Sequence, residues 1–450
     1  MNLGTGHQLI LGALAAQGPL TSAALQNITQ KSQPSVSRLL AELGGHVAPF
    51  GQARSTRYGL LKSIHGSIGQ QPLFLTTADG RMERIGDATL LSPEVLHIGG
   101  PAAEITTQGE LPWLLAPLLA QGFLGRLLAQ RLAAPGIAAD PAGWRLETQL
   151  FAALHLHDGP GALTLGEPAR ETVIKLPAEG EGDALDAMAA DVASTLPAGS
   201  SAGGEQPKFL THSAGGKALL VKFTPPRGTP FGERWHDLLY AEHLALRVLA
   251  EHGVPVAESR VVATAARTYF VSTRFDRLDQ AGRRHAVAIG GVHAGFVPGG
   301  YWSWPRTAEA LARQRRLPTL DAAQVQALWH FGRLIGNTDM HAGNLSLWVA
   351  GQSLAELLRG RFTLAPVYDM LPMRWRPDTT LGGAADYSPF EPDPLALGSG
   401  ARGPARAFWL ALARSADVSR SLRDVAGEMA ERLHGVTRPA AAGASPATLS

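Results

Sequence analysis

Three oxygen-bearing side chains in the second half of the chain form its most chemically informative pattern. Asp339 and Asn344 lie five residues apart in Asn-Thr-Asp-Met-His-Ala-Gly-Asn, and Asp369 follows beyond a stretch of hairpin length. Phosphoryl transfer from ATP needs such a set: a carboxylate at the attacking hydroxyl, and an amide and a second carboxylate on Mg²⁺. The spacing therefore predicts Asp339 as the catalytic group and Asn344 and Asp369 as Mg²⁺ ligands.

Two further residues of these segments are candidates for contact with a nucleotide. His341 has no histidine or carboxylate at a helical spacing that would complete a zinc site, so we expect it to orient the loop or touch the nucleotide. Tyr368 directly precedes Asp369, and we expect it to contact the nucleotide as well. The alternative for the whole pattern is an Asn- and Asp-capped turn followed by an unrelated aspartate.

A segment of small residues upstream predicts a loop around phosphate groups. It contains Ser201, Gly203, Gly204, Gln206 and Lys208. Glycines let backbone amides approach phosphate oxygens without a Cβ in the way. The segment matches neither GxGxxG nor a Walker A motif, and taken alone it fits a surface hairpin better.

A lysine in an apolar strand supplies the expected cation. Lys222 lies in Leu-Leu-Val-Lys-Phe, where its ammonium either reaches solvent or holds the α- and β-phosphates of ATP. The next predicted helix, Glu233 to Glu251, offers Glu242 as its partner, because an unpaired carboxylate among apolar neighbours would be costly. Thr273 and Phe275 are predicted to lie in the hinge whose backbone reads adenine.

The remaining elements of this region are predicted to position these groups. Asp276 and Arg277 follow the hinge, and the alternative for them is a structural ion pair. We expect a helix over 321–336 to deliver the loop of Asp339, and strands over 345–349 and 361–365 to lead to Asp369.

Composition limits the class of protein. With 450 residues, two or three domains are expected, and 45% apolar with 17% charged residues is typical of a folded chain. A net charge of +2 does not indicate nucleic-acid binding by itself, and the absence of cysteine excludes disulfides and thiolate sites. No segment is long and apolar enough for a membrane span or a signal peptide, so we expect no membrane partner and a cytoplasmic location.

The first 65 residues predict a winged helix-turn-helix domain that binds double-stranded DNA. Helices are expected from His7 to Gln17, after Thr21, and after Ser32, followed by a hairpin from Val47 to Leu60. The expected contacts with DNA are made by polar side chains of the third helix and by arginines of the wing. These residues are Gln33, Ser35, Ser37, Arg38, Arg54 and Arg57. The alternative is a small helical protein-interaction domain.

Residues 66–165 carry no recognisable chemistry. Strands are predicted over 72–77, 82–85 and 94–98, and a helix over 111–132. The predicted division is therefore a DNA-binding domain at 1–65, an N-terminal subdomain at 66–165, a catalytic domain at 166–436 and a disordered tail at 437–450.

The combined motifs resemble those of the HipA-type serine/threonine kinase toxins. The resemblance covers Lys175 to Leu433 and rests on Ser-Ala-Gly-Gly-Glu-Gln-Pro-Lys, Val-Lys-Phe, Arg-Phe-Asp-Arg, Asn-Thr-Asp-Met-His-Ala-Gly-Asn and Ala-Pro-Val-Tyr-Asp-Met-Leu-Pro. A chain of this length with a winged helix in front is similar to the YjjJ-like branch. The resemblance implies an α+β fold, bilobed and protein-kinase-like, that uses ATP and Mg²⁺.

The resemblance also implies partners and regulation. The substrate would be a Ser or Thr of a protein, which in some family members is an aminoacyl-tRNA synthetase. Members autophosphorylate a serine of the glycine-rich loop, here Ser201 or the adjacent Ser200. HipA proteins rely on a separate DNA-binding antitoxin, whereas here the DNA-binding unit is fused, and we expect a homodimer on a two-fold DNA site. The rival functions are a repressor whose kinase-like domain only senses a nucleotide or metabolite, and a small-molecule kinase.

Overall fold

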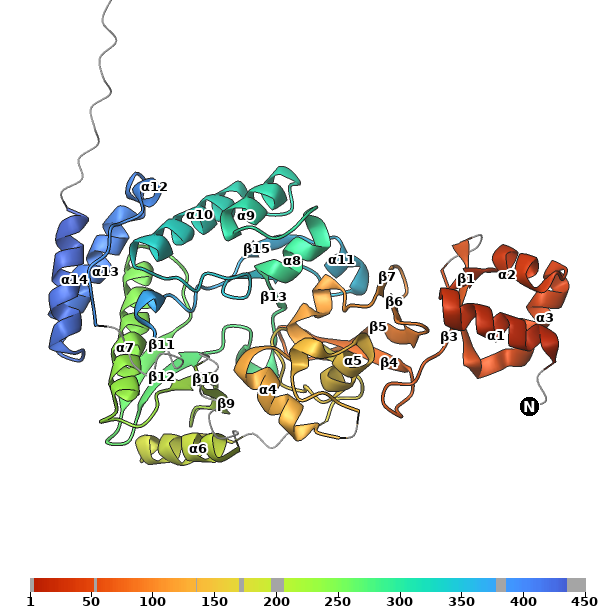
Figure 1. Cartoon of the computed structure of the whole chain (residues 1–450), viewed down its shortest axis with the longest axis horizontal. Coiled ribbons are helices and arrows are strands. Elements are labelled where there is room, and N and C mark those ends of the chain that lie inside the picture. The colour runs from red at the N-terminus through yellow and green to blue at the C-terminus, as the bar shows by residue number, and fades with distance from the viewer. Residues whose placement is uncertain are drawn as a thin grey trace, which may run out of the picture.

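The computed structural model describes residues 4–51, 55–134, 136–169, 174–195, 206–377 and 386–434. The described residues form four antiparallel sheets, and each sheet is accompanied by helices. Figure 1 shows the N-terminal unit at one end of the molecule and the C-terminal helices α13 and α14 at the other. The predicted tail, 437–450, lies outside the described residues.

The N-terminal unit combines three helices with a small antiparallel sheet of order β1-β3-β2. Its elements are α1 (Thr5–Gln17), β1 (Leu20–Thr21), α2 (Ser22–Thr29), α3 (Gln33–Leu43), β2 (Val47–Phe50) and β3 (Arg57–Leu60). Val36, Leu40 and Leu43 of α3 are buried against α1 and α2, as their spacing predicts. The Thr21 side chain caps α2 by accepting from Ala24 N–H at 3.3 Å.

The cap predicted for the third helix differs in detail. Ser32 occupies the position before α3, but its hydroxyl bonds to the hydroxyl of Ser35 at 3.0 Å and not to the helix backbone. Pro34 in the first turn lacks an N–H, so fewer backbone donors need a cap there.

The middle unit is a five-stranded antiparallel sheet of order β7-β6-β5-β4-β8. Its elements are β4 (Gln70–Thr76), β5 (Met82–Leu91), β6 (Val95–Gly99), β7 (Glu104–Gln108), α4 (Gly122–Arg131), α5 (Leu146–Leu154) and β8 (Leu163–Leu165). Leu61 pairs with Leu91, so the end of the N-terminal unit is attached to β5.

One helix predicted in the middle unit is wrong. The segment 111–132 forms a 3-10 helix, Trp113–Leu118, and then α4. Pro117 and Gly122, whose φ is +62°, interrupt the continuous helix that the apolar pattern suggested.

The first lobe is a four-stranded antiparallel sheet of order β11-β12-β10-β9 between two helices. Its elements are α6 (Glu181–Thr195), β9 (Lys208–His212), β10 (Ala218–Phe223), α7 (Pro230–Glu251), β11 (Ser259–Ala263) and β12 (Thr268–Thr273). Because strand side chains alternate, Leu219, Val221 and Phe223 pack towards α6, and Lys222 points to the face that α7 covers.

The second lobe is mainly helical around a three-stranded sheet of order β13-β14-β15. Its elements are β13 (Ala286–Ala288), α8 (Ile289–Phe296), α9 (Trp304–Arg313), α10 (Thr319–Leu334), β14 (Ser346–Val349), α11 (Leu354–Leu358), β15 (Phe362–Leu364), α12 (Pro394–Leu397), α13 (Arg402–Arg414) and α14 (Arg420–Arg432). The predicted helix at 321–336 and the strand pair at 345–349 and 361–365 are confirmed within two residues.

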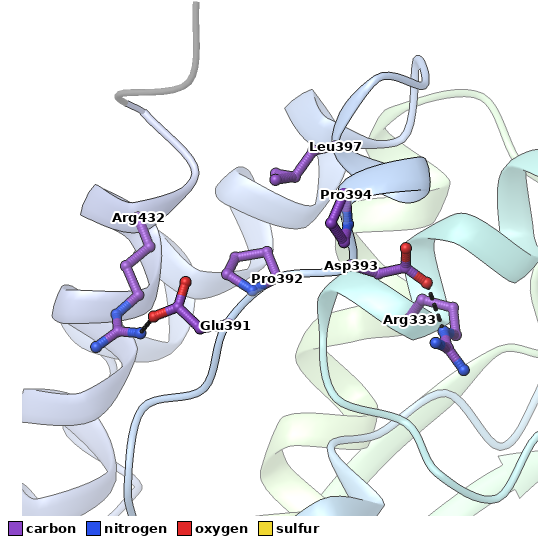
Figure 2. Close-up of a pocket in the computed structure, with 7 residues that line it drawn as sticks. All are labelled: Arg333, Glu391, Pro392, Asp393, Pro394, Leu397 and Arg432. Atoms are coloured by element: carbon purple, nitrogen blue, oxygen red, sulfur yellow. Dashed lines mark hydrogen bonds and ion pairs between the residues drawn. The ribbon is translucent and has the colours of Figure 1, made fainter.

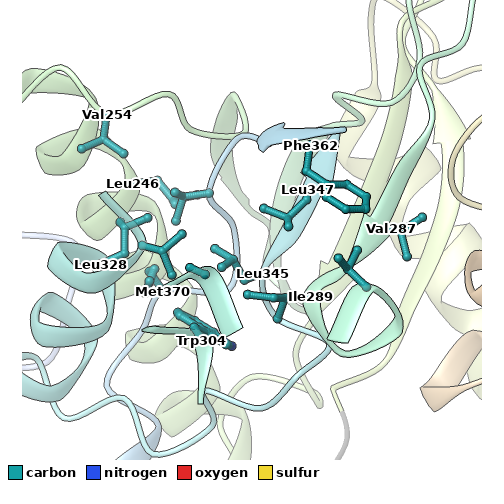
Figure 3. Packing of buried hydrophobic residues seen from close by; sticks show 14 of the residues in the cluster. Leu246, Val254, Val287, Ile289, Trp304, Leu328, Leu345, Leu347, Phe362 and Met370 are labelled. Atoms are coloured by element: carbon teal, nitrogen blue, oxygen red, sulfur yellow. The ribbon is translucent and has the colours of Figure 1, made fainter. Parts of the chain in front are cut away.

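A single apolar core joins the middle unit to both lobes. It contains side chains from the five-stranded sheet, from α7 and from α8–α14. Figure 3 shows part of it, with Leu246 of α7, Leu328 of α10 and Leu347 of β14 in the same cluster. The site described next is therefore held between elements that share one core.

Candidate active site

The centre of the site is Lys222, which is 6% exposed. Its ammonium donates to both carboxylate oxygens of Glu242, at 2.7 and 2.9 Å, and also to the carboxylate of Asp369. Glu242 is 1% exposed, on the same stripe of α7 as Leu238, Leu246 and Leu249. The predicted Lys222–Glu242 pair is confirmed, and Lys222 also reaches the predicted metal ligand of the other lobe.

Two carboxylates share this one ammonium, and their pKa values move in opposite directions. Burial raises the pKa of Glu242 to about 7, and the charge of Lys222 only partly offsets it. Burial also acts on Asp369, but Lys222 and then Lys208 outweigh it and hold the pKa of Asp369 below its usual value. Burial disfavours the charged form of Lys222, yet the two carboxylates raise its pKa above the ordinary range. The ammonium therefore stays charged, and Asp369 is the firmer anion.

The predicted catalytic loop follows directly on the end of α10. Gly336 has a φ of +75°, a conformation that suits glycine and turns the chain out of the helix. Asn337 then accepts from the Asp339 N–H at 3.0 Å through Oδ1 and donates through Nδ2 to the Asp369 carbonyl at 3.2 Å. Asn344 donates to the Asp339 carbonyl at 2.8 Å. These bonds bring the three predicted residues Asp339, Asn344 and Asp369 into one place.

The backbone and neighbours of Asp369 fix where its carboxylate points. Asp369 has a φ of +54°, which is uncommon outside glycine and is tolerated best by Asn and Asp. The hydroxyl of Tyr368 donates to the Gly343 carbonyl at 2.8 Å and bonds to Ser346 at 2.7 Å. Tyr368 thus ties the segment that carries Asp369 to the loop of Asp339. This structural role was not predicted from the position of Tyr368 next to Asp369.

His341 orients the loop, as one of its two predicted roles requires. Its Nδ1 accepts from the Gly343 N–H at 2.9 Å, and its carbonyl accepts from the indole N–H of Trp304 at 2.8 Å. The described residues contain no cluster of three or more His, Cys, Asp or Glu side chains that could hold a metal ion. A metal bound by Asn344 and Asp369 would consequently take its other ligands from phosphate or water.

Two of the three backbone N–H groups of the predicted hinge, 273–275, already have partners. The N–H of Thr273 is already bonded to the Glu258 carbonyl at 2.8 Å, and the N–H of Arg274 to the Ala218 carbonyl at 2.9 Å. Within the described chain the N–H of Phe275 has no backbone partner, so Phe275 keeps a backbone donor that a ligand could use. The Phe275 ring lies 5.7 Å from the Tyr368 ring, which gives the site an aromatic wall.

The alternative for Asp276 and Arg277, a structural ion pair, is confirmed and is larger than predicted. Asp276 is 6% exposed and binds Arg274 at 3.0 Å and Arg277 at 2.8 Å. Both guanidinium groups also bind Asp158 of the middle unit at 2.7 Å. Burial acts to raise the pKa of Asp276, but the two guanidinium groups outweigh it and lower the pKa. The hinge is therefore attached to the middle unit by a buried charge cluster.

The glycine-rich segment is only partly described. Ser200, Ser201, Gly203 and Gly204 lie outside the described residues, and Gln206 and Lys208 lie inside them. Lys208 is opposite Lys222 in the β9–β10 pair. The Nε2 of Gln206 is buried and has no hydrogen-bond partner within the described chain.

The residues present fit ATP and Mg²⁺. The site offers two lysines for phosphates, a carboxylate held in its anionic form, and an Asn344 Oδ1 that makes no hydrogen bond in the described chain. The unpaired Nε2 of Gln206 adds a donor at the end of the loop predicted to contact phosphate. Hard oxygen ligands of this kind suit Mg²⁺.

The predicted DNA contacts form a separate group on the N-terminal unit. Gln33, Ser37 and Arg38 are exposed on α3, and Arg57 is exposed on β3. Ser35 is half-buried and bonds to Ser32, which leaves it less available than predicted. Arg54 lies outside the described residues.

Sequence reasoning missed two sets of residues that organise the site. Asn337 belongs to the motif around Asp339, but no role was predicted for it. The signal was its side-chain amide, which can donate and accept at once and so can join two loops. Asp158 lies in a segment without a motif, more than a hundred residues before its arginine partners, and no local signal identifies it.

No helix among the described residues combines the length and the apolar character needed to cross a bilayer.

Comparison with known proteins agrees with this architecture. The family model described as HipA-like C-terminal domain matches residues 200–436, and the model described as YjjJ-like toxin, middle domain, matches residues 68–174. Toxin YjjJ of Escherichia coli (strain K12) is 35% identical over 440 residues, covering 93% of this chain and 96% of the relative.

A solved structure shows the same fold at low sequence identity. It is a chain of the Shewanella oneidensis MR-1 toxin–antitoxin complex of HipA, HipB and its operator DNA, with a TM-score of 0.52 and 16% identity over 81% of this chain and 95% of that chain. The fold is thus kinase-like in the manner of HipA. On the matched domains and the full-length relative, the chain belongs to the HipA-like toxin family, in its YjjJ branch.

Proposed function

We propose that the protein is an ATP- and Mg²⁺-dependent kinase that phosphorylates Ser or Thr residues of a protein. The observation that carries the proposal is the contact of Lys222 with both Glu242 and Asp369, beside the loop that presents Asp339. A lysine between a helix carboxylate and a metal-binding aspartate is what kinases use to hold ATP phosphates.

The roles follow from the geometry. Lys222 and Lys208 would hold phosphates, Asn344 and Asp369 would hold Mg²⁺, and the bound Mg²⁺ would neutralise charge on the phosphates. The acceptor hydroxyl would give its proton to Asp339 while its oxygen bonds to the γ-phosphorus. The bond between that phosphorus and the β,γ-bridging oxygen breaks, and ADP leaves.

An assay with a matched variant tests the proposal. Purified protein and Asp339→Ala are incubated with labelled ATP, Mg²⁺ and cell proteins, and ATP binding is measured separately. The variant should bind ATP with affinity close to that of the parent protein but transfer label at least about 100-fold more slowly, because a positioned base contributes about 10²- to 10⁴-fold. Equal labelling by the variant would rule out Asp339 as the catalytic group.

The rival is a repressor whose kinase-like domain only senses a nucleotide. It is distinguished by the same assay, since it predicts ATP binding without transfer by either protein. The presence of Asp339 beside Lys222, Asn344 and Asp369 favours the enzyme, because binding of a nucleotide alone requires no base at an acceptor hydroxyl.

Autophosphorylation of Ser201, or of Ser200, is a further part of the proposal. A phosphate adds nearly two negative charges beside the ATP phosphates and should oppose nucleotide binding. Mass spectrometry after incubation with ATP, compared with Asp339→Ala, should locate the phosphate on one of these serines. An unmodified loop in active protein would contradict this part alone.

We also propose that the N-terminal unit is a winged helix that binds double-stranded DNA as part of a homodimer. The exposed Arg38 and Arg57 support the proposal, since arginines at such positions reach phosphates. Replacing both by alanine should weaken DNA binding. The slope of the logarithm of the DNA association constant against the logarithm of the salt concentration should become shallower by about one per lost phosphate contact. Arg131→Ala, which removes one positive charge from α4, should change neither. Light scattering should give the mass of a dimer.

A further inference from the structure

A groove leads away from the predicted catalytic carboxylate. A cavity of about 470 Å³ is lined by the loop from Gly336 to His341 and, on its other sides, by Arg374, Phe390, Glu391 and Asp393. A second cavity of about 510 Å³ shares Arg333, Glu391 and Asp393 with it. The two cavities therefore adjoin, and the first of them contains Asp339 in its wall.

Most charges of this groove are already neutralised within the protein. Figure 2 shows Glu391 paired with Arg432 and Asp393 paired with Arg333, at 2.5 and 2.9 Å. These pairs leave little net charge in the outer cavity.

Arg374 differs from the other arginines of the groove. Its guanidinium lies over the Phe390 ring, 4.9 Å from the centroid, and it makes no ion pair with any described residue. A cation–π contact orients a guanidinium without using its hydrogen-bond donors. Arg374 is exposed and lines the same cavity as Asp339, so its donors are available to a bound anion.

We propose that this groove binds the acceptor segment of the protein substrate, and that Arg374 selects segments with an Asp or Glu near the acceptor Ser or Thr. The inference rests on the proposed kinase function and adds the substrate class. A carboxylate can bind a guanidinium in a bidentate manner, whereas a lysine or arginine of the substrate would be repelled by Arg374.

The acidic residue should not adjoin the acceptor. Asp339 and Asp369 repel a carboxylate placed beside them. An extended segment rises about 3.3 Å per residue, so a scan of four positions on each side of the acceptor covers about 13 Å in each direction from Asp339.

The test compares peptide sets that share one acceptor serine. In one set Asp is scanned over four positions on each side of the serine, and in the other Lys replaces it. Each set is assayed for kcat/KM with the full-length protein, with Arg374→Glu, and with Arg376→Glu. Arg376 is an exposed arginine two residues on that lines neither cavity, so it controls for the change of charge.

The parent protein should prefer the best Asp peptide over its Lys counterpart by about tenfold or more, equivalent to 1.4 kcal/mol. Arg374→Glu should reverse the preference, and Arg376→Glu should keep it. An unchanged preference in Arg374→Glu would overturn the inference while leaving the kinase function standing.

Two other outcomes would also overturn the inference. An equal loss of kcat/KM for all peptides, with weaker ATP binding, would mean that Arg374 contacts the nucleotide phosphates. Binding of ATP without transfer to any peptide or cell protein would refute the proposed function and the inference together.

Discussion

Replacement of Glu242 by glutamine should affect phosphoryl transfer more strongly than the stability of the free protein. In the structure Lys222 has two carboxylate partners, Glu242 and Asp369. Glu242→Gln removes one of them, and Lys222 keeps the other, so the loss of stability should be about 1.5–3 kcal/mol, the scale of one charge-assisted hydrogen bond. For a unit of 150–250 residues, that lowers Tm by about 3–12 °C.

The larger effect should occur when Asp369 turns to Mg²⁺. In the variant Lys222 would then have only the ATP phosphates as charged partners, without the carboxylate that fixes the direction of its ammonium. Because a misplacement of about 1 Å costs about 10²-fold, kcat/KM for phosphoryl transfer should fall by about 10²-fold.

The assay is phosphoryl transfer at saturating Mg²⁺, accompanied by thermal unfolding of the same samples. Glu251→Gln is the matched control, because Glu251 is at the exposed end of the same helix and its side chain is 61% accessible. A Glu242→Gln protein with kcat/KM within threefold of the parent would refute the reasoning. So would a fall in Tm large enough to leave the variant unfolded at the assay temperature.

Three further predictions concern stability. Asp276→Asn, which leaves its two arginine partners to share one carboxylate, should lower the free energy of unfolding by about 3 kcal/mol in denaturant titrations; a change below 1 kcal/mol would show that the cluster contributes little. His285 is 4% exposed and burial lowers its pKa to about 4, so stability should be full above pH 6.5 and fall by about 3 kcal/mol as pH drops towards 4. His285→Gln should flatten that part of the pH profile measured by thermal unfolding, and an unchanged profile would assign it to other groups. Tyr387→Phe removes the 2.8 Å bond to Asp237 on α7 and should cost about 1–2 kcal/mol, with a smaller or absent effect if Ser419 alone satisfies that carboxylate.

The charged and metal-binding residues of the site were predictable because residues of these types are tolerated at such positions for few reasons. A lysine in an apolar strand and a glutamate on the apolar stripe of the next helix can be buried only as a pair, and the structure pairs Lys222 with Glu242. Asn344 and Asp369 were predictable from spacing, since a turn and a hairpin return the chain to the same edge.

The rest could not be predicted because it depends on contacts distant in sequence. Asp158 meets Arg274 only after the middle unit has packed against the first lobe. The helix predicted over 111–132 from its apolar periodicity is interrupted at Pro117 and Gly122. At these two residues the backbone preferences outweigh the apolar pattern. The sequence also does not indicate which backbone N–H groups of the predicted hinge have partners, since the Thr273 N–H is bonded to the Glu258 carbonyl through tertiary structure.

The charge cluster at the end of β12 limits how this protein can be divided. A gene fragment that starts at residue 166 would encode Arg274 and Arg277 without Asp158. It would also lack the Gly159 and Gly161 carbonyls, which accept from Arg277 at 2.6 and 2.9 Å. Such a fragment should express poorly, and grafting a middle unit from another chain should succeed only if the graft brings an equivalent acid. The two regions would therefore have to be inherited together, as one unit of folding.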